Sequence, residues 1–178
     1  MNISAVFLDR EGVITRKLEE GEYLLNPEDV NLADDIIQGL RQLNEMKIPL
    51  FIVSNQSCVQ RGMITLERAL SIHEIVLQRL AEHGIEIRDS RICPHVDADG
   101  CECRKPKPGM ILDLCSFHGI DPTCTVMIGD SDTDIQAGQR SHGALQIYIG
   151  TLRPDVLAAI FAPDLNTAVQ KIMNFILG

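Results

Sequence analysis

The stretch FLDREGVI, at residues 7–14, decides the fold. Its apolar start continues a run that begins at Ile3 and is typical of a buried strand in a parallel sheet. Two carboxylates, Asp9 and Glu11, follow this run, and the chain then turns through Gly12. Taken alone, the pair is either a solvated charged turn or the first part of an active site.

Strands and helices alternate along the rest of the chain. Apolar runs predict strands, and apolar side chains at helical spacing predict helices. The predicted strands span Ile3–Leu8, Ile48–Ser54, Ser90–Cys93, Thr125–Gly129 and Ala144–Gly150. The predicted helices span Asp34–Met46, Thr65–Ala81, a segment opening at Pro108 and Gly109, a segment from Asp132, and Leu165–Leu177. This order predicts an α/β fold, with a Rossmann-like parallel sheet covered by helices on both faces.

Length and composition limit the class of protein. The 178 residues, 45% of them hydrophobic, can bury one good core, so we expect a single domain over residues 1–178. The net charge of -9 argues against nucleic acid as a partner, because that binding depends on clustered Lys and Arg. No apolar run approaches the roughly 18–20 residues of a membrane span, and residues 1–8 lack the basic start of a signal peptide. We therefore expect a cytoplasmic monomer without a membrane partner.

Polar side chains follow three of the predicted strands. Asp9 and Glu11 follow the first, Ser54 and Asn55 the second, and the aspartates of GDSDTD, at residues 129–134, the fourth. Each set alone also fits a capped turn or a helix start. Because ligands of such sheets bind outside the carboxyl ends of the strands, the shared placement predicts one site at this edge.

The expected site has the chemistry of phosphoryl transfer. Carboxylates gathered at one edge repel each other unless a cation lies among them, and their oxygens suit Mg²⁺. A carboxylate could then attack a neutralised phosphate through an aspartyl-phosphate. This reaction also needs a hydroxyl donor and a fixed cation on the transferring oxygens. Ser54 can supply the hydroxyl, and Lys105 or Lys107 the cation.

A second metal site is predicted in the irregular stretch that leads to Pro108. Its ligands, spaced C-x-H-x5-C-x-C, are Cys93, His95, Cys101 and Cys103. Two close pairs of soft ligands match a closed tetrahedral Zn²⁺ site. No ligand position remains for water, so the metal would be structural and would order a loop, the zinc loop at residues 93–103, that has little apolar content. The other three cysteines fit reduced thiols.

The motifs FLDREGVI, VSNQS, RKPKPG and MIGDSDTD, in that order, resemble the four motifs of the haloacid dehalogenase-like phosphatases. The resemblance covers residues 6 to about 149. It implies that Asp9 is the nucleophile, that Glu11 stands at the acid/base position, and that Ser54 and Lys105 hold the phosphoryl group.

The same resemblance implies that Mg²⁺ is bound by Asp9, Asp130 and the backbone carbonyl of Glu11, with Asp134 supporting these ligands. The family usually has aspartate where this chain has Glu11. The extra methylene can displace the carboxyl by about 1 Å, and a misplacement of that size can cost on the order of 10²-fold in rate. A backbone ligand would not be affected.

Within the family, the zinc loop resembles those of the D-glycero-D-manno-heptose 1,7-bisphosphate phosphatases and the histidinol-phosphate phosphatases. The stretches SNQSCVQRG, CRKPKPGM and GEYLLNPED favour the former. By this resemblance Arg104 recognises a substrate phosphate, and Asn55, Gln56 and Ser57 line the sugar site together with Tyr23. Little or no cap domain is implied, in agreement with the lack of a large insertion.

Three hypotheses follow for the function. The first is a Mg²⁺-dependent phosphatase that removes the C7 phosphate of heptose bisphosphate, with histidinol phosphate or another small phosphate ester as the alternative substrate. The second is a phospho-sugar binding protein with weak turnover because of Glu11. The third is phosphotransfer from Asp9 to an acceptor other than water. The first is favoured because every other motif is intact.

Overall fold

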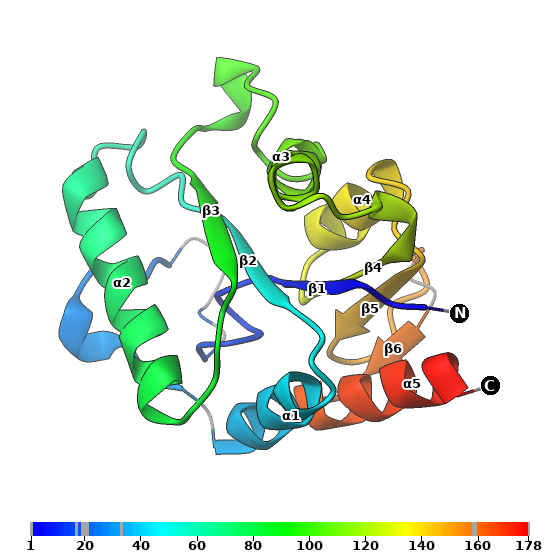
Figure 1. Cartoon of the computed structure of the whole chain (residues 1–178). Coiled ribbons are helices and arrows are strands. Elements are labelled where there is room, and N and C mark those ends of the chain that lie inside the picture. The colour runs from blue at the N-terminus through cyan, green and yellow to red at the C-terminus, as the bar shows by residue number, and fades with distance from the viewer. Residues whose placement is uncertain (1, 17, 19–21, 33, 158–159, 178) are drawn as a thin grey trace.

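The computed structural model describes residues 2–16, 18, 22–32, 34–157 and 160–177. Within them, six parallel strands form one sheet in the order β3-β2-β1-β4-β5-β6 (Figure 1). The strands are β1 Ala5–Leu8, β2 Leu50–Asn55, β3 Asp89–Cys93, β4 Thr125–Gly129, β5 Leu145–Ile149 and β6 Ile160–Ala162. The predicted α/β fold with a parallel sheet is confirmed.

Helices cover both faces of the sheet, as predicted. They are α1 Asp34–Glu45, α2 Leu66–Glu82, α3 Gly109–His118, α4 Asp132–Arg140 and α5 Leu165–Leu177. Successive strand residues point to opposite faces, so Val6 and Leu8 of β1 lie in the core beneath α1, α2 and α5. Ala5 and Phe7 of the same strand pack with α3 and α4. β1 is therefore buried on both faces, which explains its continuous apolar run.

The ends of the elements differ from the predicted ones by one or two residues in most cases. Three short 3₁₀ turns, Pro27–Asp29, Asp97–Asp99 and Pro122–Cys124, lie in the connections. The strand β6 was not predicted, because three residues are too few to show a periodic pattern, and its position depends on pairing with β5. The single-domain organisation stays a prediction. Among the described residues, no helix has the length and apolar character needed to cross a membrane.

The strand order reverses between β1 and β4. From β1 the chain builds outward through β2 and β3, and it then returns to the other side of β1 for β4, β5 and β6. The loops after β1 and β4 consequently diverge and leave a crevice at the carboxyl edge, the usual ligand position in open α/β sheets. Asp9 directly follows β1 and Asp130 directly follows β4, so both lie at this switch point.

Candidate active site

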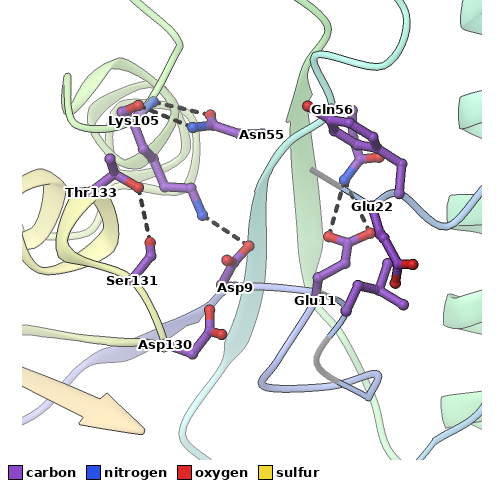
Figure 2. Close-up of a pocket in the computed structure, with 11 residues that line it drawn as sticks. Asp9, Glu11, Glu22, Asn55, Gln56, Lys105, Asp130, Ser131 and Thr133 are labelled. Atoms are coloured by element: carbon purple, nitrogen blue, oxygen red, sulfur yellow. Dashed lines mark hydrogen bonds and ion pairs between the residues drawn. The ribbon is translucent and has the colours of Figure 1, made fainter. Parts of the chain in front are cut away.

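The loops that follow β1, β2 and β4 meet in a cavity of about 190 Å³ (Figure 2). Its lining residues are Asp9, Glu11, Leu18, Glu22, Tyr23, Asn55, Gln56, Lys105, Asp130, Ser131 and Thr133. The structure thus brings most of the predicted site residues together. Four of those predicted around Asp9 do not line the cavity: Ser54, Ser57, Arg104 and Asp134.

Lys105 lies at the centre of the site, between two carboxylates. Its Nζ is 2.9 Å from Oδ1 of Asp9 and 2.6 Å from Oδ1 of Asp134, and it donates a 2.7 Å hydrogen bond to the carbonyl of Val53. The side chain is only 2% exposed. Asn55 fixes its backbone, since the amide Nδ2 donates to the carbonyl of Lys105 and Oδ1 accepts from its N–H. The cation is therefore held rigidly against Asp9.

Of the two lysines in RKPKPG, only Lys105 reaches the cavity. The ammonium of Lys107 donates to the carbonyl of Gly100 and to the carboxylate of Glu102, both 2.9 Å away on the zinc loop. This placement resolves the alternative that the sequence left open.

The site carries more negative than positive charge. Burial, together with the charge of Asp134, raises the pKa of Asp9 to about 8, and the neighbouring Lys105 only partly opposes this shift. Burial alone would lower the pKa of Lys105, but Asp134 and Asp9 outweigh it and raise that pKa above its usual range. A cation placed among these carboxylates would relieve the excess negative charge.

One group of carboxylates has the right donors for such a cation. Among the described residues, Asp9, Asp130 and Asp134 each offer an oxygen, and these atoms lie within 4.8 Å of one another. Asp134 is occupied by protein contacts, because Oδ1 meets Lys105 and Oδ2 accepts from the N–H and hydroxyl of Ser131. The hard oxygen donors fit Mg²⁺, with Asp9 and Asp130 as ligands and Asp134 as their support.

Gly12 lets the turn after β1 pass close to Asp130. Its φ is +79°, and a Cβ at this position would stand 2.2 Å from Oδ2 of Asp130. Any other residue would therefore be strained in its backbone and would also displace the carboxylate at the switch point.

We expect Gly12→Ala to lower the free energy of unfolding by about 2–4 kcal/mol and to weaken Mg²⁺ binding at least roughly tenfold. Gly84→Ala is the matched control, because Gly84 has a φ of +73° but open space at its Cβ position. It should cost only about 1 kcal/mol and leave Mg²⁺ binding unchanged. Urea unfolding and titration calorimetry measure both; equal losses in the two variants would contradict the close packing against Asp130.

The carboxylate of Glu11 accepts hydrogen bonds from protein donors and is not part of the set formed by Asp9, Asp130 and Asp134. Oε1 accepts from Nε of Arg10 at 2.9 Å, and Nη2 of Arg10 also donates to it. Oε2 accepts from the hydroxyl of Ser54 at 3.1 Å and from Nε2 of Gln56 at 3.0 Å (Figure 2). Burial alone would raise the pKa of Glu11, but the Arg10 guanidinium and the hydrogen bonds outweigh it, so the pKa is lowered. Arg10 is fully buried.

The remaining predicted substrate residues occupy the rim or lie behind it. The hydroxyl of Tyr23 is 3.0 Å from that of Ser57, which joins the loop after β1 to the loop after β2. Nε of Arg104 donates to the carboxylate of Asp97 at 2.7 Å, and Nη1 donates to the carbonyl of His95. Arg104 thus directly follows the zinc loop, contacts it, and lies outside the cavity.

The four predicted zinc ligands lie together at the end of β3. The sulfur of Cys103 is 3.1 Å from that of Cys93 and 3.4 Å from that of Cys101, and Nδ1 of His95 is 3.3 Å from the sulfur of Cys103. Ligands about 2.0–2.3 Å from one tetrahedral centre have similar separations. The donor set and its spacing fit structural zinc, and the loop it would order leads directly into Lys105.

Arg10 and Glu22 were missed by the sequence reasoning, as were Leu18, Ser131 and Thr133 of the cavity lining. Arg10 was hidden because an arginine between two carboxylates in a turn is ordinarily solvated, whereas here it is buried. Glu22 lines the cavity beside Tyr23, and its place in the stretch GEYLLNPED was the available signal.

Known proteins resemble this chain in both sequence and fold. A model of the haloacid dehalogenase-like hydrolases matches residues 3–142. The D-glycero-beta-D-manno-heptose-1,7-bisphosphate 7-phosphatase of Yersinia pestis is 34% identical over 161 residues, which are 86% of this chain and 84% of the relative. That of Rhodopseudomonas palustris is 39% identical over 142 residues, which are 76% and 77% of the two chains.

The fold agrees with these matches. The crystal structure of D,D-heptose 1,7-bisphosphate phosphatase from B. bronchiseptica, complexed with magnesium and phosphate, superposes with a TM-score of 0.83. The match covers 98% of this chain and 99% of the other at 24% identity, and therefore shows the shared fold. By sequence, the chain belongs to the haloacid dehalogenase-like hydrolases and, within them, to the D-glycero-beta-D-manno-heptose-1,7-bisphosphate 7-phosphatase family.

Proposed function

We propose that this chain is a Mg²⁺-dependent phosphatase that removes the C7 phosphate of D-glycero-D-manno-heptose 1,7-bisphosphate through an aspartyl-phosphate. One observation carries the proposal: Asp9 and Asp130 end the two strands at the switch point, and the buried ammonium of Lys105 lies 2.9 Å from Asp9. The substrate is supported by the relatives at 34% and 39% identity, which are heptose bisphosphate 7-phosphatases.

Asp9 performs the covalent step. Its carboxylate attacks phosphorus, the bond from phosphorus to the sugar oxygen breaks, and the departing oxygen takes a proton. Water then attacks the aspartyl-phosphate and gives up a proton, and the bond between Asp9 and phosphorus breaks to release inorganic phosphate. Glu11, two residues further on, is the acid in the first step and the base in the second, and it takes the acid role away from the Arg10 contact that lowers its pKa.

The groups around Asp9 hold charge and geometry during both steps. Lys105 and the hydroxyl of Ser54 hold the phosphoryl oxygens, and Asp134 keeps the ammonium of Lys105 in place. Asp9, Asp130 and the backbone carbonyl of Glu11 would hold Mg²⁺. When bound, Mg²⁺ supplies positive charge that offsets the carboxylates and the phosphate.

The outer part of the cavity suits a polyhydroxylated sugar. Glu22 offers a carboxylate, and Asn55 and Gln56 offer amide groups, which donate and accept hydrogen bonds to hydroxyls. Tyr23, held by Ser57, closes the rim. Arg104 adjoins Lys105 in the chain and is the residue that recognises a substrate phosphate beyond the cavity.

Phosphate release from a panel of substrates tests this function. With Mg²⁺, we expect release from heptose 1,7-bisphosphate to be at least about tenfold faster, in kcat/KM, than from histidinol phosphate or an aryl phosphate, because only the first uses all of these contacts. Asp9→Asn, which lacks the nucleophile, sets the background rate.

Each other outcome of the panel identifies an alternative. Faster release from histidinol phosphate would transfer the activity to that substrate. Release at the Asp9→Asn background from every substrate, together with Mg²⁺-dependent binding of heptose bisphosphate, would replace the phosphatase by a phospho-sugar binding protein. The contacts of Glu11 with Ser54 and Gln56 make the phospho-sugar binding protein the second candidate function.

A further inference from the structure

The hydroxyl of Ser54, which the proposed function places on the phosphoryl group, faces a carboxylate of the protein itself. Ser54 is fully buried and is not part of the cavity lining, whereas Glu11 is. The hydroxyl of Ser54 donates to Oε2 of Glu11 at 3.1 Å, and Nε2 of Gln56 donates to the same oxygen at 3.0 Å. In Figure 2 the Glu11 carboxylate points to Gln56 and away from Asp9. Glu11 thus accepts hydrogen bonds from two neutral donors, Ser54 and Gln56, around the end of β2.

Arg10 holds the carboxylate in this position. Its Nε and Nη2 both donate to Oε1 of Glu11, and its side chain is 1% exposed. Nη1 has no hydrogen-bond partner among the described residues, so the hydrogen bonds that the guanidinium donates to them go to Glu11. A buried guanidinium with one carboxylate partner binds that partner firmly, because separating the pair would leave a buried charge uncompensated.

Carboxylate and phosphate oxygens are both anionic acceptors, and they compete for the same donors. We propose that Arg10 is a positioning residue that holds the Glu11 carboxylate on Ser54 and Gln56, so that the resting protein occupies the Ser54 hydroxyl, its own phosphate-binding donor, until a phosphate displaces Glu11. The inference rests on the proposed function for the placement of the phosphoryl group at Ser54. Displacement would also deliver Glu11 toward the reacting atoms, where its acid/base role requires it.

Binding of inorganic phosphate in the presence of Mg²⁺, measured by titration calorimetry, tests the inference without turnover. Glu11→Asp keeps the charge but shortens the side chain by one methylene, so its carboxylate cannot contact Arg10 and also cover Ser54 and Gln56. We expect this variant to bind phosphate roughly tenfold more tightly than the wild type. Glu67→Asp, the same change at an exposed position in the first turn of α2, should stay within about twofold of the wild type.

Arg10→Lys distinguishes positioning from a merely structural role. A lysine replaces the planar fork by a single ammonium, so Glu11 is held less firmly and phosphate should bind about three- to tenfold more tightly. In the Glu11→Asp background, the same substitution should add nothing, because the shortened carboxylate is no longer held by Arg10 on Ser54 and Gln56. An arginine that only supports the fold would leave phosphate affinity unchanged or weaken it in both backgrounds. Should Arg10→Lys fail to fold, Glu11→Asp decides.

The outcomes separate this inference from the proposed function. Unchanged or weaker phosphate binding by Glu11→Asp overturns the inference, even where the wild type hydrolyses heptose bisphosphate. Tighter binding by Glu11→Asp supports it, even where no substrate is hydrolysed and the proposed function fails.

Discussion

Lys105→Met is expected to lower phosphate release about 10³-fold and the free energy of unfolding by about 3–5 kcal/mol. Methionine keeps most of the side-chain volume but removes the only cation that contacts both Asp9 and Asp134 among the described residues. The two carboxylates then remain buried beside each other without a compensating charge. Urea unfolding gives the stability, and a phosphate-release assay at saturating Mg²⁺ gives the rate.

The response of this variant to Mg²⁺ separates its two defects. A cation bound at Asp9 and Asp130 restores part of the missing positive charge, so Mg²⁺ should recover some stability. It should not recover the rate, because the ammonium that holds the phosphoryl oxygens is still absent.

Lys107→Met is the matched control for Lys105→Met. The side chain of Lys107 is 39% exposed, and it pairs with Glu102, which is 85% exposed. A solvent-exposed pair of this kind contributes at most about 1 kcal/mol, and its loss should leave phosphate release unchanged. If Lys105→Met proved as stable and as active as Lys107→Met, the central role of Lys105 would be wrong.

The fold was predictable because its strands are buried on both faces. Val6 and Leu8 pack on one side of β1 and Ala5 and Phe7 on the other, and such strands appear in the sequence as continuous apolar runs. β6 lacks this signal. It has three residues at the edge of the sheet and depends on its pairing with β5, which is a tertiary contact.

The placement of a site residue was predictable where that residue directly follows a strand, as for Asp9 and Asp130. Side-chain direction was not predictable in the same way. Lys105 and Lys107 are two residues apart in one motif, and the sequence does not indicate that Lys105 is the buried one and Lys107 the partly exposed one. The orientation of Glu11 depends on Arg10, whose burial no local pattern indicates, because isolated arginines are usually exposed.

The largest effect on the zinc loop is expected from Cys103→Ser. Zinc bound per chain should fall from about one to near zero at micromolar metal, because structural sites depend on all four ligands for a binding free energy of about 10–16 kcal/mol. Lys105 is two residues beyond this ligand. Without the metal, the loop loses the constraint that directs the ammonium to Asp9, and phosphate release should fall at least about 10²-fold. Metal analysis and the release assay measure both.

Cys124→Ser is the control for loss of a thiol. Cys124 is half-buried and lies outside the Cys and His cluster, so zinc content and phosphate release should match the wild type. Retention of stoichiometric zinc by Cys103→Ser would contradict the four-ligand site.

A metal-exchange experiment on the wild type tests the link between the two metals. A chelator with carboxylate ligands, such as EDTA, removes both Zn²⁺ and Mg²⁺, so the contributions of the two metals are lost together. If the zinc loop positions Lys105, Mg²⁺ alone cannot restore phosphate release, because the carboxylates at the switch point would be reoccupied while the ammonium stays misplaced. Addition of Zn²⁺ followed by Mg²⁺ should restore it. Full recovery with Mg²⁺ alone would show that Asn55 holds the lysine without zinc, through its hydrogen bonds to the backbone N–H and carbonyl of Lys105.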